Sequence, residues 1–97
     1  MQRRSDLIAP VALTIAGHDP SSGAGISADL QVFSAYRLVG LSAITALTAQ
    51  STLGVSAVEP VLPGFLGQVL STLDADLPPD GVKIGMLEMD VFDMRVG

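Results

Sequence analysis

An apolar segment that leads directly into a glycine-rich segment is the feature that most constrains the fold of this chain. Residues 11–16 (VALTIA) are apolar apart from one threonine and end at Gly17, which is typical of a strand buried on both faces of a sheet. Residues 17–25 (GHDPSSGAG) combine glycine, serine, aspartate and proline, and predict a loop. From residue 26 to residue 39 apolar residues recur near helical spacing, and Gly40 follows as the expected helix stop. A strand, a loop and a helix in this order are typical of α/β proteins.

The rest of the chain continues this alternation of strands and helices. Strands are predicted at residues 42–48, 55–59 and 82–86, a helix at residues 63–75, and the start of another helix at residues 88–96. The order β-α-β-β-α-β-(α) implies an α/β fold with a mostly parallel sheet flanked by helices. No repeat or linker divides the chain, so residues 1–97 are expected to belong to one domain.

The composition is unusually apolar for a short chain. Of the 97 residues 48% are hydrophobic and only 15% are charged, so the chain either enters a membrane or forms part of a larger body. The longest apolar run, residues 7–17, contains Pro10 and is shorter than the roughly 20 residues that a membrane-spanning helix needs. Asp6 separates this run from Arg3 and Arg4, which argues against a secretory signal. We therefore expect a cytoplasmic protein with no membrane partner.

The charged residues exclude further classes of function. The net charge is −5, the five basic residues are scattered, and only 4% of residues are aromatic, so nucleic acid is not an expected partner. Cysteine is absent, which excludes disulfides and thiolate metal sites. Asp74, Asp76 and Asp80 lack the spacing of a calcium loop and are expected to form a solvated acidic surface. No metal site is expected in this chain.

The glycine-rich loop resembles two nucleotide-binding motifs without matching either. It lacks the lysine of a phosphate-binding P-loop, and Ala28 stands where a dinucleotide fingerprint requires its third glycine. One interpretation is a tight structural turn between a strand and a helix. The other is a ligand site, because open α/β sheets bind ligands at the carboxyl ends of their strands. The loop pattern by itself leaves both open.

Three sequence blocks add a specific resemblance. Residues 16–30 (AGHDPSSGAGISADL), 44–55 (ITALTAQSTLGV) and 83–87 (KIGML) are similar, in order and in approximate spacing, to blocks of the hydroxymethylpyrimidine/phosphomethylpyrimidine kinases of thiamine biosynthesis. That family belongs to the ribokinase-like superfamily, so the resemblance implies the N-terminal part of a ribokinase-like fold. It also implies an enzyme that uses ATP and Mg²⁺ to phosphorylate 4-amino-5-hydroxymethyl-2-methylpyrimidine and its monophosphate, and that is commonly a homodimer at full length.

The resemblance assigns binding roles to particular residues. Asp29 matches an aspartate near the substrate hydroxymethyl group, and Gln50 matches a glutamine whose amide pairs with the aminopyrimidine edge. Four further positions match the pocket wall: Gly17, Ala24, Thr48 and Met86. A primary amide carries a donor beside an acceptor, which complements an amino group beside a ring nitrogen. Taken alone, each residue has an ordinary explanation: Asp29 in the first turn of a helix, Gln50 in a loop and Met86 in the core.

His18 is the only histidine, and we expect it to make hydrogen bonds in the loop rather than to act as a catalytic base. The family's downstream Gly-Thr-Gly-Cys-type and Asn-x-x-Glu motifs, which provide catalysis and magnesium placement, do not occur in this sequence. No catalytic residue and no ATP or Mg²⁺ site is therefore expected here, and residues 1–97 are expected to be an incomplete, inactive kinase domain with an exposed sheet edge. The alternative is a non-catalytic module that binds a pyrimidine or a partner protein.

Overall fold

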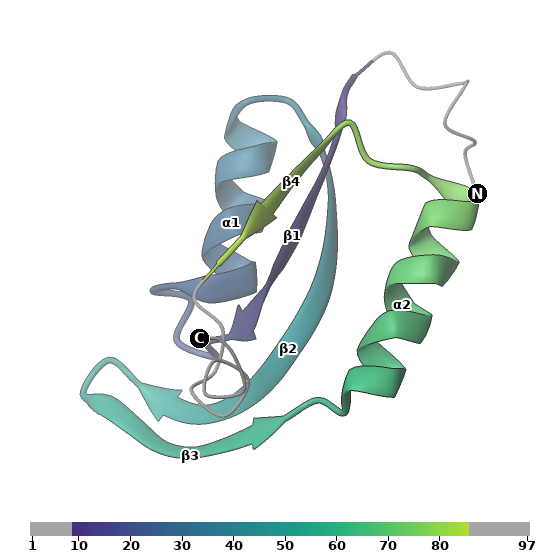
Figure 1. The fold of residues 1–97 in the computed structure, drawn as a ribbon. Helices are drawn as coiled ribbons and strands as arrows, with labels where there is room; N and C mark the ends of the chain where they lie inside the picture. The colour runs from purple at the N-terminus through teal and green to yellow at the C-terminus, as the bar shows by residue number, and fades with distance from the viewer. Residues whose placement is uncertain (1–8, 86–97) are drawn as a thin grey trace.

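The computed structural model describes residues 9–85, which form a four-stranded sheet with two helices (Figure 1). The elements are β1 (Val11–His18), α1 (Gly25–Ala35), β2 (Val39–Ser51), β3 (Gly54–Pro60), α2 (Pro63–Asp76) and β4 (Gly81–Ile84). The two helices lie on either side of the strands (Figure 1). The predicted order β-α-β-β-α-β is confirmed, while the helix expected at residues 88–96 lies outside the described residues.

The sheet is mostly parallel, as predicted. Its strand order is β3-β2-β1-β4, and β1 pairs in parallel with both β2 and β4. The exception is β3, which pairs antiparallel with β2 because a two-residue connection at residues 52–53 is too short for a crossover. None of the helices in the described part of the chain is both long enough and apolar enough to cross a bilayer.

Strand β1 lies at the centre of the fold. Its neighbouring residues Leu13 and Thr14 point to opposite faces and are 5% and 0% exposed, so both faces are covered, as the apolar run predicts. The strand continues two residues further into the glycine-rich segment than expected, because His18 still pairs with Leu47 of β2. The loop before α1 is correspondingly shorter, at residues 19–24.

Helix α1 ends at Ala35, before the predicted boundary at residue 39, because Arg37 adopts a left-handed conformation with φ of 61°. The Arg37 N–H donates to Ser34 O and the Leu38 N–H donates to Phe33 O, which is the hydrogen-bond pattern of a Schellman cap. The prediction that Gly40 stops the helix is therefore wrong.

Gly40 instead lies in β2, directly under α1. A Cβ atom there would lie 2.9 Å from Leu30 Cδ2 and 3.3 Å from Phe33 Cδ2. The glycine therefore allows the helix to approach the sheet closely, which is a packing role and not a conformational one.

Helix α2 and the edge strand β4 are poorly covered by the rest of the described chain. Helix α2 begins at Pro63 as predicted, yet none of its residues is buried, and Phe65 is 59% exposed. In β4, Val82 and Ile84 are 53% and 64% exposed. Apolar side chains thus lie exposed at the β4 edge of the described sheet, in agreement with the expectation from the composition.

Candidate functional site

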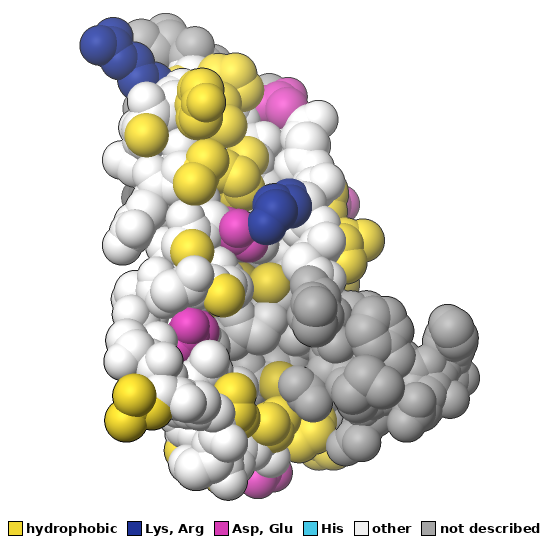
Figure 2. Space-filling view, turned by 90° about the vertical axis from the view of Figure 1, so that its left-hand side faces the viewer, with side chains coloured by type: hydrophobic (Ala, Val, Ile, Leu, Met, Phe, Trp, Pro, Cys, Tyr) yellow, Lys and Arg dark blue, Asp and Glu magenta, His cyan; other side chains and the backbone are white. Residues whose placement is uncertain are grey.

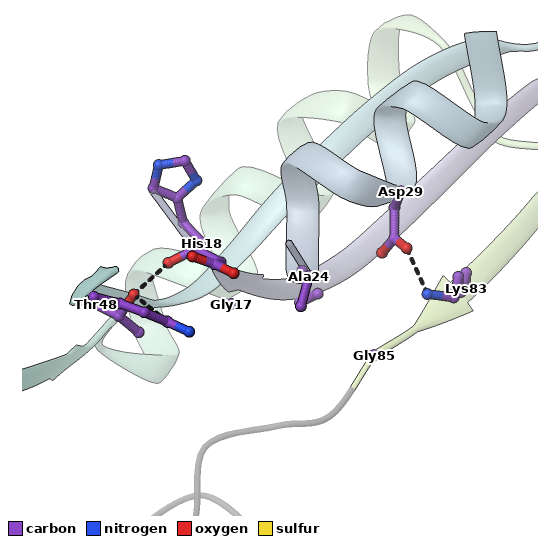
Figure 3. A pocket seen from close by; sticks show the side chains of 11 residues that line it. Gly17, His18, Ala24, Asp29, Thr48, Lys83 and Gly85 are labelled. Atoms are coloured by element: carbon purple, nitrogen blue, oxygen red, sulfur yellow. Dashed lines mark hydrogen bonds and ion pairs between the residues drawn. The ribbon is translucent and has the colours of Figure 1, made fainter. Parts of the chain in front are cut away.

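A cavity of about 310 Å³ lies where β1 and β4 end and α1 begins. Open α/β sheets place ligands at this position, beyond the carboxyl ends of parallel strands. Five of the six residues that the resemblance assigns to a pocket line the cavity: Gly17, Ala24, Asp29, Thr48 and Gln50. The sixth, Met86, lies outside the described residues. The lining also includes His18, Asp19, Lys83 and Gly85 (Figure 3).

Asp29 is one of two buried acidic residues that line the cavity, the other being Asp19. Its carboxylate accepts a hydrogen bond of 2.6 Å from Thr14 Oγ1 of β1 and one of 2.6 Å from Lys83 Nζ of β4. Burial by itself would raise the pKa of Asp29, but the hydrogen bonds from Lys83 and Thr14 and the charge of Lys83 outweigh it, so this pKa lies below its ordinary value. Asp29 is therefore a carboxylate that can accept a further hydrogen bond from a ligand hydroxyl.

The position of Asp29 differs from the sequence expectation. Because α1 begins at Gly25, Asp29 lies beyond the first turn, and no acidic residue occupies that turn. Its side chain is directed across the sheet to β1 and β4 rather than to the start of its own helix. The helix-dipole explanation of Asp29 is therefore wrong.

Lys83 is a cavity residue that the sequence reasoning missed. It lies beside Thr14 in the parallel pairing of β1 and β4, so both residues reach Asp29 from the same face of the sheet. Figure 2 shows a basic side chain directly beside an acidic one on the side of the molecule that α1 occupies in Figure 1. One signal was present in the sequence: a lysine inside an otherwise apolar strand usually requires a charged partner.

The opposite wall of the cavity is a short hydrogen-bonded chain. Thr48 Oγ1 lies 2.8 Å from His18 O and 2.9 Å from Gln50 Oε1. The His18 imidazole is turned away from Thr48, while its carbonyl oxygen faces Thr48 (Figure 3). His18 lies at the end of β1 rather than in the loop, and its backbone carbonyl oxygen accepts the hydrogen bond from Thr48.

The glycine-rich loop is folded around its own carboxylate. The buried Asp19 accepts hydrogen bonds of 2.6 Å from Ser21 Oγ and 2.8 Å from the Ser21 N–H. The Ser21 hydroxyl is the main cause of a lowered Asp19 pKa, and backbone N–H groups of Gly23 and Ala24 add to it against the opposing effect of burial. In a P-loop such N–H groups would face a phosphate; here an internal carboxylate takes that place. The loop is therefore a self-capped turn, as the structural interpretation predicts, and its residues Asp19 and Ala24 also line the cavity.

Gly25 joins this loop to α1 at a position that only glycine fits. Its φ is +68°, and a Cβ atom would lie 2.2 Å from the carbonyl oxygen of Gly17. The start of the helix can approach the end of β1 only because that Cβ is missing. This contact sets the distance between Asp29 on the helix and the strand ends that form the rest of the cavity.

The sheet and its cavity define an α/β protein of the class that holds small molecules at the carboxyl ends of parallel strands, without a nucleotide fingerprint of its own. A model of the phosphomethylpyrimidine kinase family matches residues 19–94. The chain therefore belongs to the phosphomethylpyrimidine kinase family, as its resemblance to the pyrimidine kinases predicted.

Individual relatives agree with this assignment. The chain is 49% identical over 78 residues to a hydroxymethylpyrimidine/phosphomethylpyrimidine kinase of Synechococcus elongatus, covering 80% of this chain and 30% of that protein. It is 52% identical over 83 residues to the enzyme of the same name from Escherichia coli K12, covering 84% and 31%. The chain thus spans about 30% of the length of these curated relatives.

Two solved structures are similar to the fold of this chain. A phosphomethylpyrimidine kinase from Clostridium difficile matches with a TM-score of 0.79 and 49% identity, over 81% of this chain and 34% of that one. A Bacillus subtilis pyridoxal kinase in complex with ADP matches with a TM-score of 0.76 and 34% identity, over 89% and 34%. The described residues form part of the ribokinase-like fold of these kinases, which confirms the predicted fold class.

Proposed function

We propose that this chain is the substrate-binding part of an ATP-dependent kinase that phosphorylates 4-amino-5-hydroxymethyl-2-methylpyrimidine and its monophosphate. The observation that carries the proposal is that Asp29 and Gln50, which lie on different elements, line one cavity in a member of this family. Residues 1–97 then form an incomplete kinase domain. A cytoplasmic location and a homodimeric full-length protein are further parts of the proposal, supported by the resemblance to the family.

Each polar residue has a distinct role in this proposal. The Gln50 amide pairs with the amino group and the neighbouring ring nitrogen of the pyrimidine. The charged Asp29 accepts a hydrogen bond from the hydroxymethyl group and so holds the oxygen that becomes phosphorylated. Gly17, Ala24, Thr48 and Met86 form the wall, where small residues allow the flat ring to approach the backbone.

ATP and Mg²⁺ are proposed to bind to parts of a full-length protein that this chain does not contain. Within residues 9–85 no three His, Asp or Glu side chains gather into a group that could hold a metal ion. The loop N–H groups that resemble a phosphate site face Asp19. These residues therefore do not fit a triphosphate or its metal ion, and no catalytic residue is proposed here.

Calorimetry of the 97-residue chain with the free aminopyrimidine tests the proposal. We expect binding that is lost in Gln50→Ala and kept in Gln68→Ala, a matched control because Gln68 is exposed on α2. No heat at millimolar ligand would contradict the binding role. We also expect no product from the chain with ATP and Mg²⁺, and turnover by the pure chain would contradict the assignment of catalysis to other parts of the protein.

A non-catalytic pyrimidine-binding or interaction module remains the second candidate. One observation favours it: the described residues already bring five of the assigned positions around one cavity without the remaining 70% or so of the relatives' length. Binding that does not strengthen when the rest of a family kinase domain is supplied in trans would support this candidate over the first.

A further inference from the structure

The hydrogen-bonded chain His18–Thr48–Gln50 contains one proton too few for the bonds that its distances allow. Thr48 Oγ1 lies within hydrogen-bond distance of two oxygen atoms, His18 O and Gln50 Oε1. A threonine hydroxyl has a single proton to donate, and neither a backbone carbonyl oxygen nor an amide oxygen can donate one. Only one of the two contacts can therefore be a full hydrogen bond while the amide keeps this orientation.

The Gln50 amide can resolve the conflict and the His18 carbonyl cannot. A half-turn about the last side-chain torsion of a glutamine exchanges its oxygen and nitrogen atoms at nearly the same positions. With the nitrogen next to Thr48, the hydroxyl donates to His18 O and accepts from the amide N–H. That orientation makes two hydrogen bonds instead of one and leaves no oxygen facing another oxygen without a proton between them.

We propose that Thr48 is a positioning residue that fixes the order in which Gln50 presents its donor and acceptor, and thereby makes the pocket select a 4-aminopyrimidine over a 4-oxopyrimidine. This inference rests on the proposed function. The amide N–H lies on the Thr48 side and the amide oxygen on the far side. A ligand in front of Gln50 must then place its ring-nitrogen acceptor near Thr48 and its amino donor beyond it.

The order of donor and acceptor also decides which way round the ring binds. In the proposed substrate the amino group stands between the ring nitrogen and the carbon that carries the hydroxymethyl group. Turning the ring over reverses the order of its acceptor and donor and also moves the hydroxymethyl group to the other side of Gln50. A fixed orientation of the Gln50 amide therefore accepts only the ring orientation that directs the hydroxymethyl group toward Asp29. A 4-oxo ring presents a ring N–H and a carbonyl, the reverse order, and leaves both Gln50 contacts unmade in the productive orientation.

Competition binding with two ligands tests the inference. The probes are 4-amino-5-hydroxymethyl-2-methylpyrimidine and its 4-oxo analogue, and the measured quantity is the ratio of their dissociation constants. The unchanged 97-residue chain should prefer the amino compound by about tenfold or more, as expected when a mismatch leaves polar groups unpaired. Thr48→Val keeps the shape of the side chain but removes the hydroxyl, so the amide can turn and the ratio should fall to within about threefold.

Two further variants separate positioning from structure. Thr48→Ser retains the hydroxyl and should restore the preference. Thr72→Val makes the same chemical change on exposed α2, where the Thr72 hydroxyl donates to Gln68 O, and should leave the ratio as in the unchanged chain. A structural defect in Thr48→Val would weaken both ligands in parallel and leave the ratio high, which would overturn the inference.

A measurement without ligand tests the orientation of the Gln50 amide directly. Nuclear Overhauser contacts from the Gln50 side-chain NH₂ protons to Thr48 should be strong in the unchanged chain and in Thr48→Ser. Contacts that are absent in the unchanged chain would show the amide oxygen facing Thr48 and would overturn the inference while leaving the proposed function standing. If the unchanged chain binds neither pyrimidine, the proposed function and the inference fail together.

Discussion

Lys83 Nζ lies 2.6 Å from Asp29 Oδ1, which joins the edge strand β4 to helix α1 across 54 positions of the sequence. Thr14 of β1 donates to the other oxygen of the same carboxylate, also at 2.6 Å. Three elements therefore meet at one buried acid. The ionisation state of Asp29 is set by this arrangement, and several measurable properties depend on it.

Replacing Lys83 by methionine should raise the pKa of Asp29. Burial, which raises this pKa, is then opposed only by the Thr14 hydrogen bond. Lys83→Arg keeps a positive charge beside the carboxylate and should leave the pKa low. The measurement is a ¹³C NMR titration of the Asp29 carboxyl, and an identical midpoint in Lys83→Met and the unchanged chain would contradict the role given to Lys83.

Acid should destabilise the fold through Asp19 and Asp29. Both folded-state pKa values lie below the ordinary value of 3.8, so the stability that these groups contribute is fully present above that value and is lost as the pH falls through the folded pKa values. Urea unfolding should therefore give a free energy that is flat between about pH 5 and 7 and decreases below about pH 4. The decrease should be smaller in Lys83→Met, and an unchanged acid slope in that variant would count against the ion pair.

A methyl group at Gly25 should destabilise the chain strongly. Alanine there would meet both the positive φ of +68° and a backbone oxygen at 2.2 Å, neither of which can relax by moving a flexible side chain. We expect a loss of more than about 2 kcal/mol in the free energy of unfolding. Gly67→Ala, within α2 and with open space around its Cβ position, should instead stabilise by about 0.5–1 kcal/mol. Equal effects of the two substitutions in urea unfolding would contradict the close contact at Gly25.

Arg37→Gly should stabilise the chain by about 1 kcal/mol. Arg37 occupies the left-handed position of the cap that ends α1, with φ of 61°, and glycine adopts this conformation without the steric cost of a Cβ atom. Arg37 is exposed and far from the cavity lining, so ligand binding should not change. A midpoint of thermal unfolding at or below that of the unchanged chain would show that the side chain makes a compensating contact.

Asp80→Ala should loosen the start of β1. The Val11 N–H donates to Asp80 Oδ2 at 2.7 Å, and the Asp80 N–H donates to Val11 O at 2.8 Å, so the turn before β4 holds the first residue of the central strand. Val11 is 1% exposed, and leaving its N–H without an acceptor should cost about 1–3 kcal/mol. Asp76→Ala, an exposed control on α2, should change stability little. Faster amide exchange at Val11 in Asp80→Ala alone would support this role.

Local patterns predicted the elements of this fold better than their ends. Pro63 marks the start of α2 because proline suits the first turn of a helix, and the apolar run from residue 11 marks β1 because a strand covered on both faces needs it. The end of α1 was misplaced because the left-handed residue is an arginine, which carries no such signal, while a nearby glycine serves packing instead. Asp80 is exposed, as expected, but its hydrogen bonds with Val11 were not predicted, since this partner is distant in the sequence.

The loop pattern left a ligand site at the end of the first strand open, but only the family resemblance predicted which residues would line the cavity. Asp29 and Gln50 each had a commoner structural explanation, and nothing in their spacing required them to meet. Lys83 and Thr14 were missed because their contacts with Asp29 depend on strand register, which joins residues that no local pattern connects. Thr48 and Gln50, by contrast, are two positions apart on β2, so their side chains lie on the same face of the strand and their contact needs no long-range pairing.

The cavity draws its lining from nearly the full length of the described chain, from the end of β1 to Gly85 just after β4. In a partly folded species in which β4 is still unpaired, Lys83 is not beside Asp29. The site is therefore complete only after β4 has paired with β1, from which it is separated by most of the described chain. A ligand that fits the cavity must therefore bind the native state and not its precursors. Such a ligand raises the midpoint of unfolding in proportion to the logarithm of its concentration, and the binding site serves as a reporter of complete folding.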